Sequence, residues 1–157
     1  MEDGRVDRAF LRDYGELVVG GSAGTNAGAS YTVDLEGGNS TNLILNSATC
    51  TLTFSNPFTS GTVTTFSLIL NQDATGGRVV VWPSSVIWPG NTTPTLTAIA
   101  SRFDVFNFTT INGGAQWFGM VAGQNFTAPT AKRVFLTNTA QTSWVVPLDW
   151  NSSNNTI

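Results

Sequence analysis

Hydrophobic and polar residues alternate along much of the chain from Ser30 onward. Between Tyr31 and Glu36 every second residue is apolar, and the same period of two returns between Cys50 and Phe54. Clusters of Gly, Asn and Ser separate these runs. Alternation with a period of two is typical of strands that bury one face. The pattern predicts an all-β body of many short strands, an antiparallel β-sandwich or a jelly-roll-like domain.

Glycine-rich turns predict where two pairs of strands join. Gly76 and Gly77 separate the apolar run 63–70 from the run 78–82, and the turn 112–114 (Asn-Gly-Gly) separates the run 102–111 from the strand that follows it. Adjacent glycines accept the positive φ angles that tight hairpin turns need. We therefore expect two antiparallel hairpins.

The run 102–111 is apolar on both faces. Phe103 and Val105 share one face, and Phe106 and Phe108 occupy the other. An exposed face of a strand is normally polar, so this pattern favours the middle of a sandwich or a contact between subunits. These four residues are the candidates for an interface between subunits.

The first residues differ in composition from the rest. Eight of the seventeen charged residues precede Leu17, and Val6, Phe10, Tyr14 and Leu17 recur at helical spacing ahead of a glycine-rich stretch. We interpret residues 1–29 as a helical or extended docking arm with its linker. Its apolar stripe could pack on its own body, on sister copies or on another protein.

The predicted body covers residues 30–126, and a change of composition follows it. Residues 127–157 contain two further apolar runs, 132–138 and 142–147, which indicate the start of a second small β module. The sequence ends on an apolar residue after a polar tail. We expect that the chain continues beyond Ile157.

Two Trp-Pro pairs, at Trp82 and Trp88, place large aromatic side chains in stiff extended segments. Such side chains are either core residues or platforms for a ligand, and the core is the commoner place for them. Together with Trp117, they are the candidate residues for stacking on glycans.

The composition argues against an enzyme. Only 11% of residues are charged, the net charge is −3, and there is no histidine for a catalytic triad or an imidazole metal site. Asp34 and Glu36 lie two apart on one predicted strand, where a solvated face is the simplest explanation, and Asp73 lies in a turn in which a carboxylate typically binds backbone N–H groups. We expect no catalytic, metal or cofactor site.

Charge and hydropathy narrow the range of partners. The seven Lys and Arg residues are scattered, which disfavours nucleic acid. The single cysteine, Cys50, fits a small buried hydrophobic position. No run of about 18 apolar residues and no secretory signal is present, so we expect neither membrane insertion nor export by the usual route.

Several segments resemble a β-domain of bacteriophage tail-fibre and related virion proteins, especially of phages of marine and freshwater bacteria, including cyanobacteria. The segments are 31–35, 71–78, 82–83, 86–90, 117–119 and 123–126, and the piece 142–151 resembles the opening of a second phage module. The resemblance implies a homotrimeric fibre in the virion, made in the bacterial cytoplasm, with its N-terminal end on the tail or baseplate and its far end at the host surface.

The leading hypothesis is therefore a structural tail-fibre or baseplate-attached fibre subunit that supports host attachment. Three alternatives stay open at this point: a capsid decoration or cement protein, a head-fibre protein, and a module that binds glycans of the host envelope.

Overall fold

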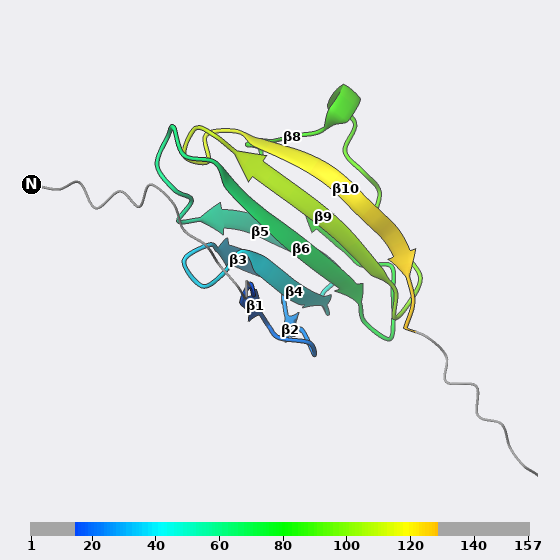
Figure 1. Ribbon diagram of the computed structural model, residues 1–157. Coiled ribbons are helices and arrows are strands. Elements are labelled where there is room, and N and C mark those ends of the chain that lie inside the picture. Colours follow the sequence, from blue (N-terminus) through cyan, green and yellow to red (C-terminus); the bar gives the residue numbers. More distant parts are fainter. Residues whose placement is uncertain (1–14, 129–157) are drawn as a thin grey trace, which may run out of the picture.

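The computed structural model describes residues 15–128, which form two layered β-sheets (Figure 1). Sheet A has the strand order β1-β4-β6-β9-β10-β8, with β2 also paired to β4, and sheet B has the order β3-β5-β7. The strands of sheet A are β1 Val18–Val19, β2 Thr25–Asn26, β4 Ser40–Leu45, β6 Thr64–Gln72, β8 Val86–Ile87, β9 Phe103–Thr110 and β10 Trp117–Phe126. Those of sheet B are β3 Ser30–Asp34, β5 Thr49–Ser55 and β7 Val79–Val81, and a 3-10 turn, η1, covers Pro89–Asn91. The prediction of an all-β domain is confirmed.

From β3 to β7 the chain passes back and forth between the two sheets, so that consecutive strands do not pair. Instead β3 pairs with β5 and β5 with β7 in sheet B, while β4 pairs with β6 in sheet A, all in parallel. Parallel neighbours need a long crossover between them. Here each crossover contains a strand of the opposite sheet, so residues 30–81 form a two-sheet parallel winding.

The hairpin expected at Gly76 and Gly77 is wrong, because the strand before these glycines lies in sheet A and the strand after them in sheet B. Instead, Gly76 allows two backbone segments to approach each other closely. A Cβ atom at Gly76 would lie 2.6 Å from the carbonyl oxygen of Ala98 and 2.7 Å from the backbone nitrogen of Ala100. The segment is thus a crossing between sheets, held against the loop that precedes β9.

The second predicted hairpin is confirmed. β9 and β10 are antiparallel, with Phe118 opposite Thr109, and Gly113 and Gly114 have φ angles of 67° and 83° in the turn between them. β6 also pairs with β9 in antiparallel fashion. Sheet A is therefore mixed, and the purely antiparallel sandwich that the sequence suggested is present only across β6, β9 and β10.

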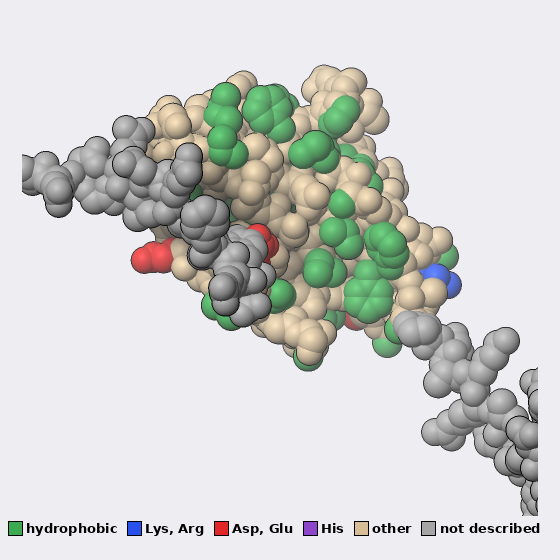
Figure 2. Space-filling view, viewed as in Figure 1, with side chains coloured by type: hydrophobic (Ala, Val, Ile, Leu, Met, Phe, Trp, Pro, Cys, Tyr) green, Lys and Arg blue, Asp and Glu red, His purple; other side chains and the backbone are tan. Residues whose placement is uncertain are grey.

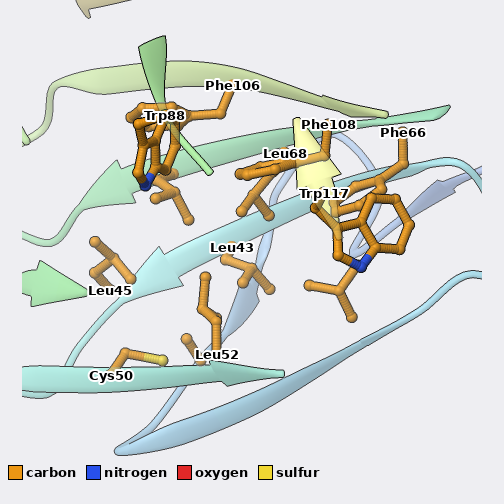
Figure 3. Close-up of a cluster of buried hydrophobic side chains, with 13 residues drawn as sticks. Leu43, Leu45, Cys50, Leu52, Phe66, Leu68, Trp88, Phe106, Phe108 and Trp117 are labelled. Carbon is orange, nitrogen blue, oxygen red and sulfur yellow. The ribbon is translucent and has the colours of Figure 1, made fainter. Parts of the chain in front are cut away.

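The core lies between the sheets, as the inward side chains of Figure 3 show. Leu43 and Leu68 come from sheet A, Leu52 and Cys50 from sheet B, and all four are almost completely buried. The expectation that Cys50 is a small buried hydrophobic residue is confirmed. Burying an aliphatic or aromatic side chain of this size contributes roughly 1.5–3 kcal/mol.

Aromatic rings close one end of the core. The ring of Phe54 lies 4.9 Å from that of Phe66 and 5.5 Å from that of Trp117, both edge to face, while Phe66 stacks on Phe108 at 5.0 Å. Edge-to-face and stacked pairs at such distances add about 0.5–1.5 kcal/mol each beyond the area they bury. Strands of both sheets contribute to this cluster, so it fastens the layers together.

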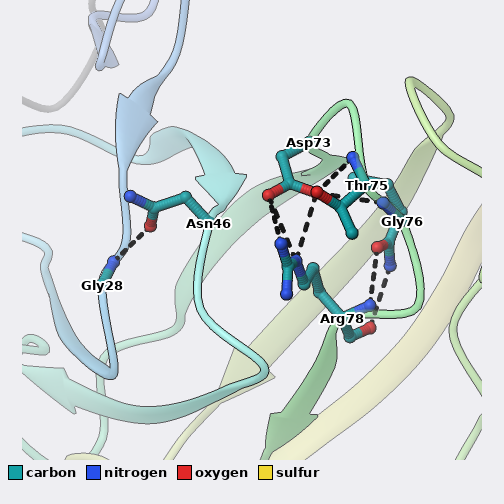
Figure 4. A network of polar contacts seen from close by, with 7 residues as sticks. Gly28, Asn46, Asp73, Thr75, Gly76 and Arg78 are labelled. Carbon is teal, nitrogen blue, oxygen red and sulfur yellow. Dashed lines mark hydrogen bonds and ion pairs between the residues drawn. The ribbon is translucent and has the colours of Figure 1, made fainter.

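The glycine-rich segment before β3 belongs to the β-body rather than to a free linker. Its two short strands, β1 and β2, both pair in parallel with β4. A Cβ atom at Gly20 would lie 2.5 Å from the carbonyl oxygen of Asn42, and the N–H of Gly28 donates to Asn46 Oδ1 at 2.8 Å (Figure 4). Because glycine has no side chain, this segment can pack closely against β4. Residues 1–14 of the predicted arm and residues 129–157 lie outside the described residues.

Candidate functional site

The three tryptophans predicted to stack on glycans belong mainly to the core. Trp117 is 1% exposed and Trp88 is 8% exposed. Trp82 is half-buried, and its ring lies 5.1 Å from that of Trp88 and 5.0 Å from that of Phe106. The interpretation as core residues is correct, and neither Trp88 nor Trp117 offers a ring face to a ligand.

The four candidate interface residues of β9 divide between the two faces of sheet A, as their alternation predicted. Phe106 and Phe108 point inward and are fully buried, so they complete the core of their own chain and are not available to a second copy. Phe103 and Val105 lie on the opposite face and are half-buried. Only this second pair can take part in a surface contact.

The outer face of sheet A carries further exposed apolar side chains, which come from β10. Phe118 is 44% exposed, Met120 46% and Phe126 51%. The strand register places Phe126 opposite Phe103 and Val105 opposite Ile69, whereas Phe118 and Met120 lie opposite Thr109 and Asn107. We call this surface the sheet A outer face and define it by Ile69, Phe103, Val105, Phe118, Met120 and Phe126.

The sheet A outer face has no charged side chain among its strand positions. Within β4, β6, β9 and β10 the one charged residue is Asp104, and it points inward. The polar positions between the apolar ones hold hydroxyl and amide groups, for example the Ser67 hydroxyl, which donates to Asn107 Oδ1 at 3.0 Å. Figure 2 shows hydrophobic side chains distributed over this side of the molecule. One charged residue from outside these strands lies at the face: Glu16 lines a hollow with Ser67, Asn107 and Met120. A protein surface that covered the apolar positions would therefore meet a charge at Glu16 alone among the described residues of this hollow.

Local sequence explains why β10 presents its apolar residues outward. Gly119 faces inward, where a Cβ atom would lie 2.7 Å from Cζ3 of Trp88, so the tryptophan ring takes the space of the missing side chain. The residues on either side of Gly119 must then point out of the sheet. Further along, the ring of Phe126 lies so close to Gly123 that a side chain there would collide with it. The alternation of Trp117 and Gly119 with Phe118 and Met120 was the signal for this face.

Asp104 is a buried carboxylate with a structural role. It is 3% exposed and accepts hydrogen bonds from the backbone N–H of Thr97 at 2.7 Å and of Asn125 at 2.9 Å, with a third from Gln124 Nε2 at 3.2 Å. A buried carboxylate requires such partners. These bonds tie the loop before β9 to the end of β10.

Asp73 organises the crossing between the two sheets (Figure 4). Its Oδ1 atom accepts the backbone N–H groups of Thr75 and Gly76, each at 3.0 Å, and Arg78 pairs with its Oδ2 atom at 2.7 Å. The hydrogen bond from Arg78 is the main cause that lowers the pKa of Asp73, and the same contact raises the pKa of Arg78. The prediction of a turn carboxylate that binds nearby N–H groups is confirmed.

Asp34 and Glu36 do not form a pair of carboxylates aimed at one point. Asp34 ends its strand, and its Oδ1 atom accepts the backbone N–H of Glu36 at 3.1 Å and Nδ2 of Asn56 at 2.8 Å. The bond from Asn56 is the largest cause that lowers the pKa of Asp34. Across residues 15–128 no three His, Cys, Asp or Glu residues group closely enough to hold a metal ion.

The residues predicted for docking lie almost entirely outside the described residues. Val6, Phe10 and Tyr14 belong to the undescribed N-terminal segment, whereas Leu17 is described and is 71% exposed, directly before β1. The docking role of this stripe stays a prediction. None of the helices in the described range is long and apolar enough to span a membrane.

Comparison with protein families decides what this mixed-sheet domain is. Residues 24–114, more than half of the chain, match the family model described as "Putative phage tail fibre C-terminal domain". The chain belongs to this phage tail-fibre family. The matched range begins just before β2 and ends in the turn between β9 and β10, so it includes the whole parallel winding of the tail-fibre domain. No curated protein and no solved structure matches the chain.

Membership in the family settles the broad context of the protein. The resemblance to phage fibres in the sequence is confirmed, and the tail-fibre domain has a structural role in the virion. Membership in the tail-fibre family also suggests association with other phage tail proteins.

Proposed function

We propose that the protein is a tail-fibre subunit that assembles as a homotrimer through the sheet A outer face and supports attachment of the phage to its host. The observation that carries this proposal is the exposed, uncharged apolar surface formed by the outward residues of β9 and β10. Contiguous apolar patches on a soluble domain typically mark contacts with other proteins. Three copies is the number that the resemblance to phage fibres implies.

The strand composition supports self-association over contact with a charged partner. The outward positions of β4, β6, β9 and β10 hold hydroxyl, amide and apolar groups, which could pair with the same groups of a second copy. A homo-oligomer formed around a rotation axis uses such surfaces repeatedly. Phe118 and Met120 supply the large side chains that dominate the energy of protein interfaces.

The proposal is tested by replacing Phe118 and Met120 with serine in one variant. We expect sedimentation of the full chain to show at least about ten-fold weaker association, equivalent to roughly 1.4 kcal/mol. The matched control replaces Val79 and Val81, which are 51% and 50% exposed on sheet B, with serine. Association that falls equally in both variants, or in neither, would contradict the assignment of the sheet A outer face.

We further propose that the N-terminal segment, with its apolar stripe Val6, Phe10, Tyr14 and Leu17, docks the fibre to the tail or baseplate. Charged residues are concentrated in this segment and sparse in the β-body, which supports a role for the segment that differs from that of the body. Removal of residues 1–14 should abolish incorporation into particles while the body keeps its fold, as judged by circular dichroism. Particles that still contain the shortened chain would exclude this docking role.

A further inference from the structure

A hollow lies between two chain connections at one end of the sheets and reaches the start of β6 at Thr64 and Thr65. The connection between β3 and β4 forms one wall, and the connection between β5 and β6 forms the other. Its volume is about 570 Å³. This lies within the range of roughly 300–1,000 Å³ that is common for small-molecule sites.

The apolar part of the hollow consists of side chains that are unusually exposed. Phe58 is 67% exposed and Val63 is 60% exposed, and Leu35 on the opposite wall is half-buried. Neither Phe58 nor Val63 belongs to the buried core of the chain. The phenyl ring of Phe58 is therefore accessible to a ligand.

The backbone holds Phe58 in place. Its N–H donates to Thr64 Oγ1 at 3.0 Å, and Thr64 is itself 6% exposed at the start of β6. Within the same connection the N–H of Thr62 donates to the carbonyl of Thr59 at 3.1 Å, and the N–H of Gly61 to the carbonyl of Ile111 at 3.0 Å. The exposed ring therefore stands on a hydrogen-bonded loop, which lowers the entropy lost when a ligand binds.

The polar part of the hollow contains amides and one carboxylate. Asn39 and Glu36 come from the β3–β4 connection, and Asn56 from the β5–β6 connection. Asn56 Nδ2 is engaged by Asp34 Oδ1, which fixes the amide and leaves its own oxygen free to accept. No lysine or arginine of the described residues lines the hollow. The carboxylate of Asp34, which contacts Asn56, adds a second negative charge beside that of Glu36. An anionic ligand would meet repulsion here.

We propose that this hollow binds an uncharged saccharide unit of a host-surface glycan. One face of a sugar ring consists of C–H groups and can stack on the exposed ring of Phe58. The edge of the sugar carries vicinal hydroxyl groups, which need hydrogen-bond partners. An asparagine amide can donate and accept at once, and a carboxylate accepts from hydroxyl donors. A purely apolar ligand would leave the groups of Asn39 and Glu36 without partners, which costs binding energy.

The proposal rests on the proposed tail-fibre function for the source of the glycan, namely the bacterial surface. The site itself is built within one chain and does not require the sheet A outer face. It also replaces the glycan platform that Trp82, Trp88 and Trp117 suggested, because Phe58 is exposed where those rings are packed in the core. Failure of binding and failure of assembly can therefore be measured separately.

The test is a titration of the full chain, followed by NMR, with lactose, maltose and N,N′-diacetylchitobiose, and with 3′-sialyllactose as the anionic counterpart of lactose. We expect at least one neutral disaccharide to bind with a dissociation constant in the millimolar range or below, equivalent to about −4 kcal/mol or better. Shifted resonances should cluster at residues 35–39 and 56–64. Sialyllactose should bind more weakly than the neutral ligands.

Phe58→Ala is the decisive variant and should weaken binding about ten-fold, a loss in the range of stacking interactions. Ile99→Ala is the matched control, since Ile99 is 54% exposed and does not line the hollow. Absence of binding by all three neutral disaccharides, equal binding by Phe58→Ala, or tighter binding of the anionic sugar would overturn the proposal. Sedimentation of Phe58→Ala should match the wild type, so a change in assembly would instead concern the tail-fibre proposal.

Discussion

The parallel winding of residues 30–81 and the hairpin of β9 and β10 use the two faces of a strand differently. In the winding, outward positions of β3 and β5 hold hydroxyl groups, and Thr32 and Thr53 hydrogen-bond to each other through their Oγ1 atoms at 2.8 Å. In the hairpin, outward positions hold Phe118, Met120 and Phe126. The outward positions of β3 and β5 thus suit contact with water, although β7 of the same sheet exposes Val79 and Val81. The hairpin completes the core with one face and exposes larger apolar side chains on the other.

The two regions also differ in how much apolar surface they leave exposed. The winding buries Val33, Leu43, Leu52 and Leu68 between its own sheets. The hairpin adds Phe106 and Phe108 to the same core and brings additional apolar surface with it. Exposing apolar surface to water is unfavourable in free energy, and apolar patches on proteins typically mark contacts with other molecules.

The largest expected effect separates the two faces of the hairpin. Phe108→Ala removes a fully buried ring and should lower the free energy of unfolding by about 3–5 kcal/mol. Phe118→Ala removes an exposed ring from the outward side of the neighbouring strand and should cost less than about 1 kcal/mol when copies are separated by dilution. Urea unfolding of both variants checks this. Equal losses would mean that the outer face is part of the fold of a single chain.

A smaller effect is expected from Gly119→Ala, which tests why β10 points its apolar residues outward. The new methyl group would meet Cζ3 and Cε3 of Trp88 and Cγ1 of Val86, all closer than 3.0 Å, and should cost about 1–3 kcal/mol through overpacking. Thermal unfolding gives the measurement. Gly15→Ala is the control, since nothing lies within 4 Å of that position. An unchanged melting temperature for Gly119→Ala would refute the packing of Trp88 against this glycine.

The smallest effect concerns the turn that carries the winding from sheet A to sheet B. The lowered pKa of Asp73 means that its contribution to stability is present above the unfolded-state pKa of about 3.9 and is lost as the pH falls through the folded-state value. Asp73→Asn should therefore be less stable than the wild type at neutral pH, and the difference should shrink below about pH 4. Unfolding curves at several pH values measure it. A difference that grows on acidification would contradict the ion pair with Arg78.

Much of the strand content could be predicted from sequence, because alternation marks which side chains are buried whatever the pairing. Val33, Leu52 and Cys50 were placed correctly on this basis, and the turn at Gly113 and Gly114 marked the hairpin. Parallel pairing was not predictable in this way. A strand with one buried face has the same alternation in a parallel and in an antiparallel sheet, and the partner lies a full turn of the winding away.

The surface sites were harder to predict than the core. Phe106 and Phe103 look alike in sequence, and only the fold decides that one completes the core while the other faces outward. Phe58 lies in an irregular connection between two strands. Such a segment has no periodic pattern of apolar residues from which its exposure could be predicted. The tryptophans were candidates for stacking on glycans, but large aromatic side chains are more often buried, and these three pack in or against the core.

The most direct test of the central claim is the molar mass of the intact chain, measured by light scattering across a dilution series in the micromolar range. Association through the sheet A outer face predicts the mass of three copies for the wild type and a shift to one copy for the Phe118→Ser, Met120→Ser variant. A wild-type chain that keeps the mass of a single copy throughout would contradict the account.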